Sequence, residues 1–169
     1  QHKHTISSFS QKCDRLFLDF NGIIHNSYNS IKHTVTLTES SSAFESLLID
    51  NVIKYMESII YYTKPRYLVY ICIDGVAPLS KIIQQRKRRY LSIFLKSKLK
   101  ETGYKWDSNA ISPGTNFMKK LNDRLEEYKR NLSSTYEIII SNSSEKGEGE
   151  HKIFDYIHFH PKTNYIDVI

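Results

Sequence analysis

The hydrophobic positions of the chain follow two patterns that alternate along its length. In the first pattern, short runs rich in apolar and β-branched residues recur, each about as long as a buried strand. We predict strands over residues 16–20, 67–73 and 136–141, and the start of a fourth over 165–169. Asn21-Gly22 follows the first run and predicts a turn there.

In the second pattern, apolar residues recur every three or four positions, which is the spacing of an amphipathic helix. Thr115 is placed to cap one of these segments, and Lys64-Pro65 ends another. We predict helices over residues 42–62, 78–100, 116–129 and 152–157.

Alternating strands and helices predict an α/β fold, with a mainly parallel sheet flanked by helices on both faces. A chain of 169 residues fits one domain and can bury a core. No repeat or linker divides it, so residues 1–169 are interpreted as a single domain in which residues 1–14 are loosely ordered. The chain lacks an initial methionine and its last strand is cut short, so we expect a partial domain, truncated at both ends.

Composition narrows the class of partner and the compartment. The formal net charge of +6 and the pI of about 9.2 favour a polyanionic partner, although excess lysine also occurs on ordinary solvated surfaces. Two cysteines, Cys13 and Cys72, make a disulfide framework improbable and favour a reducing compartment. No apolar run long enough for a bilayer and no signal peptide is visible, so we expect no membrane partner and an intracellular, cytoplasmic rather than nuclear, location.

Carboxylates follow each of the first three predicted strands. Asp19 ends the first strand, Asp74 follows the second, and Glu148 and Glu150 follow the third within a glycine-rich turn. Parallel strands end at one edge of a sheet, so these four side chains are expected to converge there. Their mutual repulsion would be relieved by hard divalent cations. Taken singly, each aspartate also fits an ordinary turn, and the glutamates fit a solvated helix start.

A basic helix face is predicted to begin beside this edge. Lys81, Gln85, Arg88 and Arg89 have the spacing of one helix face and suit a terminal phosphate, although a charged face can also be merely solvated. His25 is either a base-stacking residue or an ordinary surface histidine.

Four blocks of the sequence together resemble the Xrn-type 5′→3′ exoribonucleases. They occur in the order of that family and span most of the chain. The blocks are residues 18–25 (LDFNGIIH), 73–89 (IDGVAP, then Lys81 and QQRKRR), 111–118 (ISPGT, then Phe117-Met118) and 147–152 (GEGEHK). The composition, rich in Ile, Asn, Lys and Tyr, would also suit an AT-rich genome such as a viral one.

This resemblance implies a PIN/flap-nuclease-like core that removes nucleotides from single-stranded RNA with a 5′-monophosphate, using Mg²⁺ or Mn²⁺. Carried over by position, Asp19, Asp74, Glu148 and Glu150 match catalytic, metal-binding acids. Lys81, Gln85, Arg88 and Arg89 match the 5′-phosphate pocket, and His25 matches a base-stacking histidine.

The chain also departs from the family pattern. The opening Met-Gly-Val-Pro-like segment is absent, and Leu79 and Ser80 replace a common Arg-Ala pair. Further metal-binding aspartates of the family follow the strand that begins at Ile166, so the remaining part of the polypeptide is expected to complete the site. Asp167 lies before that motif and is given no metal role.

Two other functions stay open at this point. With an incomplete metal site, the chain would be an RNA-binding module without catalysis. A structure-specific flap-type DNA nuclease would share the same logic of clustered acids, although the basic block with Lys81 and Gln85 argues against it.

Overall fold

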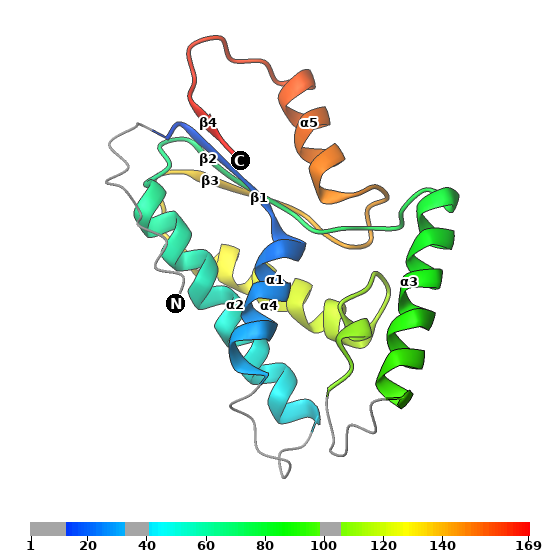
Figure 1. Cartoon of the computed structure of the whole chain (residues 1–169). Helices are drawn as coiled ribbons and strands as arrows, with labels where there is room; N and C mark the ends of the chain where they lie inside the picture. Colours follow the sequence, from blue (N-terminus) through cyan, green and yellow to red (C-terminus); the bar gives the residue numbers. More distant parts are fainter. Residues whose placement is uncertain (1–12, 33–40, 99–105) are drawn as a thin grey trace, which may run out of the picture.

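A four-stranded parallel sheet forms the centre of the protein (Figure 1). The computed structural model describes residues 13–32, 41–98 and 106–169. The strands lie in the order β3-β2-β1-β4, and every neighbouring pair is parallel. Their bounds are β1 Arg15–Asp19, β2 Leu68–Cys72, β3 Glu137–Ser141 and β4 Asp167–Val168.

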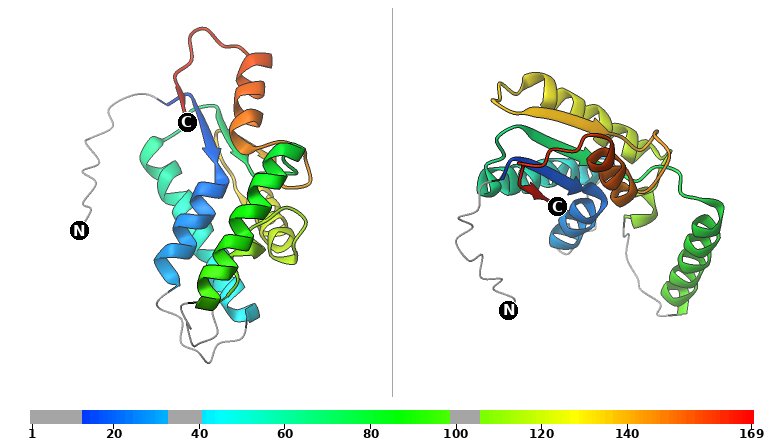
Figure 2. Two further views of the ribbon diagram at one scale, coloured as in Figure 1. Left: turned by 45° about the vertical axis from the view of Figure 1, so that its right-hand side comes forward. Right: turned by 90° about the horizontal axis from the view of Figure 1, so that it is seen from above.

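Helices cover both faces of this sheet, which confirms the α/β fold with a parallel sheet. One face is covered by α1, α2 and α4 and the other by α5, while α3 extends from the loop after β2 at the side of the molecule (Figures 1 and 2). The helices are α1 Phe20–Ile31, α2 Ser41–Thr63, α3 Leu79–Lys98, α4 Asn116–Asn131 and α5 Gly149–Phe159, with a short 3₁₀ helix, η1, at Ser108–Ala110. Residues 99 and 100, at the end of the helix predicted over 78–100, lie outside the described residues.

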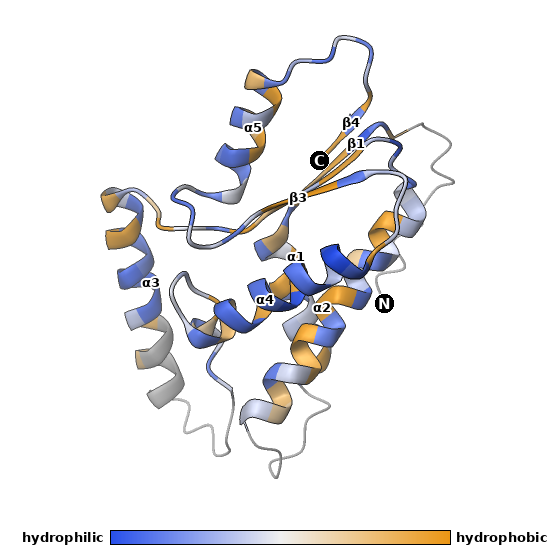
Figure 3. Cartoon of the chain, turned by 180° about the vertical axis from the view of Figure 1, so that it is seen from behind, coloured by the Kyte–Doolittle hydropathy of each residue, from blue (hydrophilic) through white to orange (hydrophobic). Residues whose placement is uncertain are grey.

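The strands divide their side chains between two hydrophobic cores. In β1, Leu16 and Leu18 pack into the core under α1, α2 and α4, whereas Phe17 packs with Ile153 of α5 on the other face. This alternation follows from the pleat of a strand. Burial on both faces explains why the strands are hydrophobic along most of their length, whereas the helices are mixed (Figure 3).

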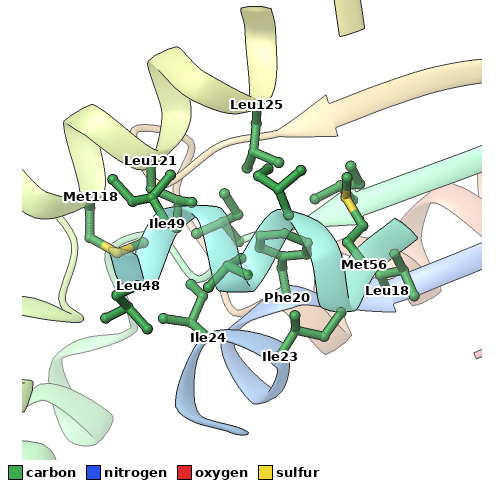
Figure 4. Packing of buried hydrophobic residues seen from close by; sticks show 14 of the residues in the cluster. Leu18, Phe20, Ile23, Ile24, Leu48, Ile49, Met56, Met118, Leu121 and Leu125 are labelled. Carbon is green, nitrogen blue, oxygen red and sulfur yellow. The ribbon is translucent and has the colours of Figure 1, made fainter. Parts of the chain in front are cut away.

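The turn predicted at Asn21-Gly22 is wrong, because β1 passes directly into helix α1 at Phe20. Phe20, Ile23 and Ile24 have helical spacing and all point into the larger core (Figure 4). Burying three large side chains contributes about 1.5–3 kcal/mol each, which outweighs the preference of an Asn-Gly pair for a turn. In contrast, the predicted cap of α4 is confirmed, since the Thr115 hydroxyl accepts a hydrogen bond from the Met118 N–H at 3.3 Å.

The first described residues are tied to the last strand. Asp14 and Arg15 are buried, and the Asp14 carboxylate accepts a hydrogen bond from the Ile166 N–H at 2.9 Å. Arg15 donates two hydrogen bonds to Asp167, from Nε at 2.7 Å and from Nη2 at 2.5 Å. The expected loose order of residues 1–14 is therefore wrong for Cys13 and Asp14, and residues 1–12 lie outside the described part of the chain.

Both cysteines are buried free thiols, as expected for Cys72. Burial raises the pKa of Cys72 to about 12 and that of Cys13 to about 11. Among the described helices, none is long and apolar enough to cross a membrane.

Two loops at the carboxyl edge of the sheet pair with each other. The Gly75 N–H donates to the Gly147 carbonyl at 2.8 Å, and the Gly147 N–H donates to the Val76 carbonyl at 3.1 Å. A Cβ on Gly75 would lie only 1.6 Å from the Glu145 carbonyl oxygen, and Gly147 has a φ of +106°. Glycine is required at both positions, by close approach at Gly75 and by the positive φ at Gly147.

We expect Gly75→Ala and Gly22→Ala to change stability in opposite directions. Gly75→Ala forces the two loops apart and should lower the free energy of unfolding by about 1–3 kcal/mol. Gly22 lies in α1 with no neighbouring atom within 4 Å of its would-be Cβ, so alanine should raise that free energy by about 0.5–1 kcal/mol. Chemical denaturation of both variants checks this, and equal stability of Gly75→Ala and wild type would show that the loops are not closely paired.

Candidate functional site

Asp19 and Asp74 converge on one small residue, Gly149. Asp19 ends β1, Asp74 follows β2, and Gly149 begins α5. A Cβ on Gly149 would lie 3.1 Å from Asp19 Oδ1 and 3.4 Å from Asp74 Oδ1. The structure therefore brings the first two predicted acids together, because β1 and β2 are adjacent, parallel and end at the same edge.

Asn21 holds Asp74 in place by two reciprocal hydrogen bonds. Asn21 Nδ2 donates to Asp74 Oδ2 at 2.9 Å, and the Asp74 N–H donates to Asn21 Oδ1 at 3.2 Å. The other carboxylate oxygen, Oδ1, accepts from the Gly149 N–H at 2.6 Å. Asn21 has no clear role in the sequence pattern, because an Asn-Gly pair is typical of a turn; the available signal is the family block that contains it.

The surroundings of Asp19 disfavour its ionised form. Burial, and then the negative charge of Asp74, raise the pKa of Asp19 above its ordinary value. Glu150 adds a smaller effect in the same direction, and a hydrogen bond from the Asn21 backbone opposes it. Glu150 thus lies within electrostatic reach of Asp19, and a cation between these groups would relieve their repulsion.

The other two predicted acids form a group with a histidine. Glu148, Glu150 and His151 each offer a ligand atom, and these atoms all lie within 4.8 Å of one another. Glu148 occupies the N-cap position of α5, and Glu150 lies in its first turn. His151 was not predicted as a site residue, although its position directly after Glu150 at a helix start was a usable signal.

These side chains fit a divalent metal ion. Carboxylate oxygens are preferred ligands of both Mg²⁺ and Mn²⁺, and the imidazole of His151 is a further nitrogen donor beside them. Burial and the negative charge of Asp74 both raise the pKa of Asp19, and a bound cation would favour its ionised form. The donor set and the charge therefore agree with a metal-binding edge.

The basic residues of α3 contact different parts of this edge. Lys81 Nζ lies 3.3 Å from Glu148 Oε2, so the helix touches the acidic group directly. Arg89 Nη2 donates to the buried Ser112 hydroxyl at 2.8 Å, in the loop before α4. Gln85, half-buried, lies one turn after Lys81. A joint phosphate pocket formed by these residues and Arg88 stays a prediction.

His25, on α1, lies within electrostatic range of Arg88 on α3. Partial desolvation, and then the positive charge of Arg88, lower the pKa of His25, whereas Asp74 raises it. The histidine is exposed at the surface and is favoured in its neutral form, in which the ring can stack on an aromatic group.

Asp167 is separated from the acidic edge. It pairs with Arg15 at the start of β1, whereas Asp19 lies at the end of that strand. This agrees with the exclusion of Asp167 from the metal site.

The fold and this site define an α/β domain with clustered carboxylates at the carboxyl edge of a parallel sheet, an arrangement suited to metal-dependent phosphodiester chemistry. The family model described as the XRN 5'-3' exonuclease N-terminus matches residues 1–168. The chain belongs to this family, which confirms the resemblance found in its sequence blocks.

The curated relatives of the chain are named as 5'-3' exoribonucleases. The chain is 35% identical to 5'-3' exoribonuclease 2 of Aspergillus fumigatus over 87% of its length, and 32% identical to that of Schizosaccharomyces pombe over 92%. It is 35% identical to 5'-3' exoribonuclease 1 of Saccharomyces cerevisiae over 85%. It covers only 16%, 18% and 10% of these proteins, respectively, so it spans less than a fifth of their lengths.

We expect Asp19→Asn to raise the melting temperature at pH 7 in the absence of divalent ions. Because the native-state pKa of Asp19 is raised, its ionised form destabilises the fold at neutral pH. This penalty shrinks as the pH falls through the raised pKa and is lost below the ordinary value of 3.8. The gain from Asp19→Asn should follow the same course in thermal unfolding scans.

Asp123→Asn, which removes an exposed charge on α4, serves as the control for this comparison. A lower melting temperature of Asp19→Asn than of wild type at pH 7 would contradict the repulsion between Asp19 and its neighbours.

Proposed function

We propose that this chain forms part of the catalytic region of a 5′→3′ exoribonuclease that hydrolyses single-stranded RNA bearing a 5′-monophosphate. The proposal rests on one observation: carboxylates from three separate strand ends meet at one edge, and Lys81 of α3 reaches the same edge. The names of the relatives supply the polarity and the RNA substrate.

Asp19, Asp74, Glu148 and Glu150 would hold Mg²⁺ or Mn²⁺, with His151 as a further candidate ligand. Divalent cations at such a site supply Lewis-acid chemistry for phosphodiester hydrolysis. The protein itself contributes orientation, because Asn21 and the Gly149 N–H fix both oxygens of Asp74.

The 5′-phosphate would bind to the α3 face that carries Lys81, Gln85, Arg88 and Arg89. Guanidinium groups bind phosphate oxygens through paired hydrogen bonds, and the Ser112 hydroxyl already orients one of them, Arg89. The neutral ring of His25 would stack on the adjacent base.

The rest of the polypeptide would add acids to this site. Within the described part of the chain, β4 pairs with Arg15 and Leu16, at the start of β1. A strand that continued β4 in the same register would run beside the second half of β1 and reach the edge where Asp19 lies.

A cytoplasmic location of the protein also stays a prediction.

The complete protein should degrade RNA with a 5′-monophosphate at least tenfold faster than RNA with a 5′-triphosphate or a cap. A pocket fitted to one phosphate excludes the larger ends. Single-turnover decay of three RNAs that differ only at the 5′ end measures this. Glu150→Gln should abolish decay and leave RNA binding within about twofold, because it removes a carboxylate ligand and keeps the shape.

Equal decay of all three RNAs would refute the phosphate pocket. RNA binding without decay by wild type would instead favour the RNA-binding module, and faster cleavage of a DNA flap than of RNA would favour the flap nuclease.

Arg88→Ala should reduce the preference for the 5′-monophosphate by roughly tenfold or more, the effect of losing one charge-assisted hydrogen bond of about 1.5–3 kcal/mol. The matched control is Arg86→Ala, which removes an exposed arginine about 160° away around α3 at 100° per residue. Competition between monophosphate and hydroxyl ends checks the preference, and equal losses in the two variants would show only a general charge effect.

A further inference from the structure

Lys152 is a buried lysine that the proposed chemistry does not use. It lies on α5, two residues after Glu150, and only 9% of the residue is exposed. Its ammonium donates hydrogen bonds to two main-chain oxygens, the Ile73 carbonyl at 2.8 Å and the Asn142 carbonyl at 3.0 Å. A buried ammonium is costly unless its donors are satisfied, and these carbonyls satisfy two of its three.

Both carbonyls lie where the parallel strands end. Ile73 follows β2 and directly precedes Asp74, while Asn142 follows β3 and opens the loop that leads to Glu148. The Ile73 N–H still donates to the Ser141 carbonyl at 2.9 Å, which is the last step of the ladder between these strands. Lys152 therefore bridges the two chain segments just beyond the last backbone hydrogen bond between β2 and β3.

One side chain thus connects the three segments that carry the acids after β2 and β3. Its own helix carries Glu150, one hydrogen bond holds the peptide before Asp74, and the other holds the start of the loop before Glu148. A shift of α5 relative to the strand ends would break at least one of these bonds.

We propose that Lys152 is a positioning residue for the acidic edge, holding Asp74 and Glu150 at the separation that a shared divalent cation requires. This inference rests on the proposed function, because it assigns Lys152 a role in the same metal site. A purely structural lysine would affect stability alone. A lysine acting only as a competing positive charge would weaken metal binding, so its removal would tighten it.

The test compares Lys152→Met and Lys152→Arg with wild type in the complete protein, using Mn²⁺ alone as the probe. Methionine keeps an unbranched side chain of similar length and removes the charge and the donors. Lys146→Met is the matched control, since Lys146 is an exposed lysine in the loop between β3 and α5. Electron paramagnetic resonance of free Mn²⁺ gives the dissociation constant, and thermal unfolding without metal shows that each variant is folded.

We expect Lys152→Met to raise the Mn²⁺ dissociation constant at least tenfold, and the metal concentration for half-maximal RNA decay by a similar factor. RNA binding without metal should stay within threefold, because α3 is not held by Lys152. Lys146→Met should stay within twofold in every measurement. If Lys152→Met does not fold, Lys152→Arg decides by the same comparison, with an expected increase of at least threefold because the guanidinium is larger than the ammonium.

Unchanged or tighter Mn²⁺ binding by the folded variant would overturn the positioning role, whatever happens to the melting temperature. The Mn²⁺ measurement needs no catalysis, so it is separate from the proposed function. Wild type that binds Mn²⁺ and fails to degrade RNA would refute the exoribonuclease proposal and leave the comparison of Lys152 variants intact.

Discussion

The close approach of carboxylates at one edge of the sheet is the constraint that the rest of the site must accommodate. Parallel pairing of β1, β2 and β3 places their carboxyl ends together, and each of these ends leads to an acid. Burial, and then the negative charges of Asp74 and Glu150, raise the pKa of Asp19, so the ionised form of this carboxylate is disfavoured at the edge. A fold that needed only stability would not gather these charges, so their convergence indicates a binding function.

Neutral donors and small residues hold the acids in this arrangement. Asn21 and the Gly149 N–H orient Asp74 without adding charge. Gly75 lets the two loops touch, and Gly149 leaves space between the carboxylates. Positive charge comes from two lysines, Lys81 at the rim and Lys152 beneath the strand ends. Hydrogen bonds and close backbone approach thus fix the positions from which the acids meet.

The strands and the acids that follow them could be predicted from the sequence, because both depend on local patterns. A run of apolar residues that ends in an aspartate is visible without coordinates, and parallel pairing then fixes which acids meet. The start of α1 could not be predicted from the sequence. Its helical conformation is stabilised by burial of Phe20, Ile23 and Ile24 in the core, which a local pattern does not show. Asp74, the partner of Asn21, is 53 residues away, and Ile73, one of the two partners of Lys152, is 79 residues away, so no local signal could reveal these two contacts.

The pairing of Arg15 with Asp167 has a consequence for biosynthesis. The two residues are 152 positions apart, and a ribosome makes about 5–20 residues per second, so roughly 8–30 seconds separate their synthesis. During that interval, β1 can pair with β2 on one side only, and the Arg15 guanidinium has no carboxylate partner from β4. The edge of β1 that faces β4 therefore keeps unpaired backbone groups until β4 has been made.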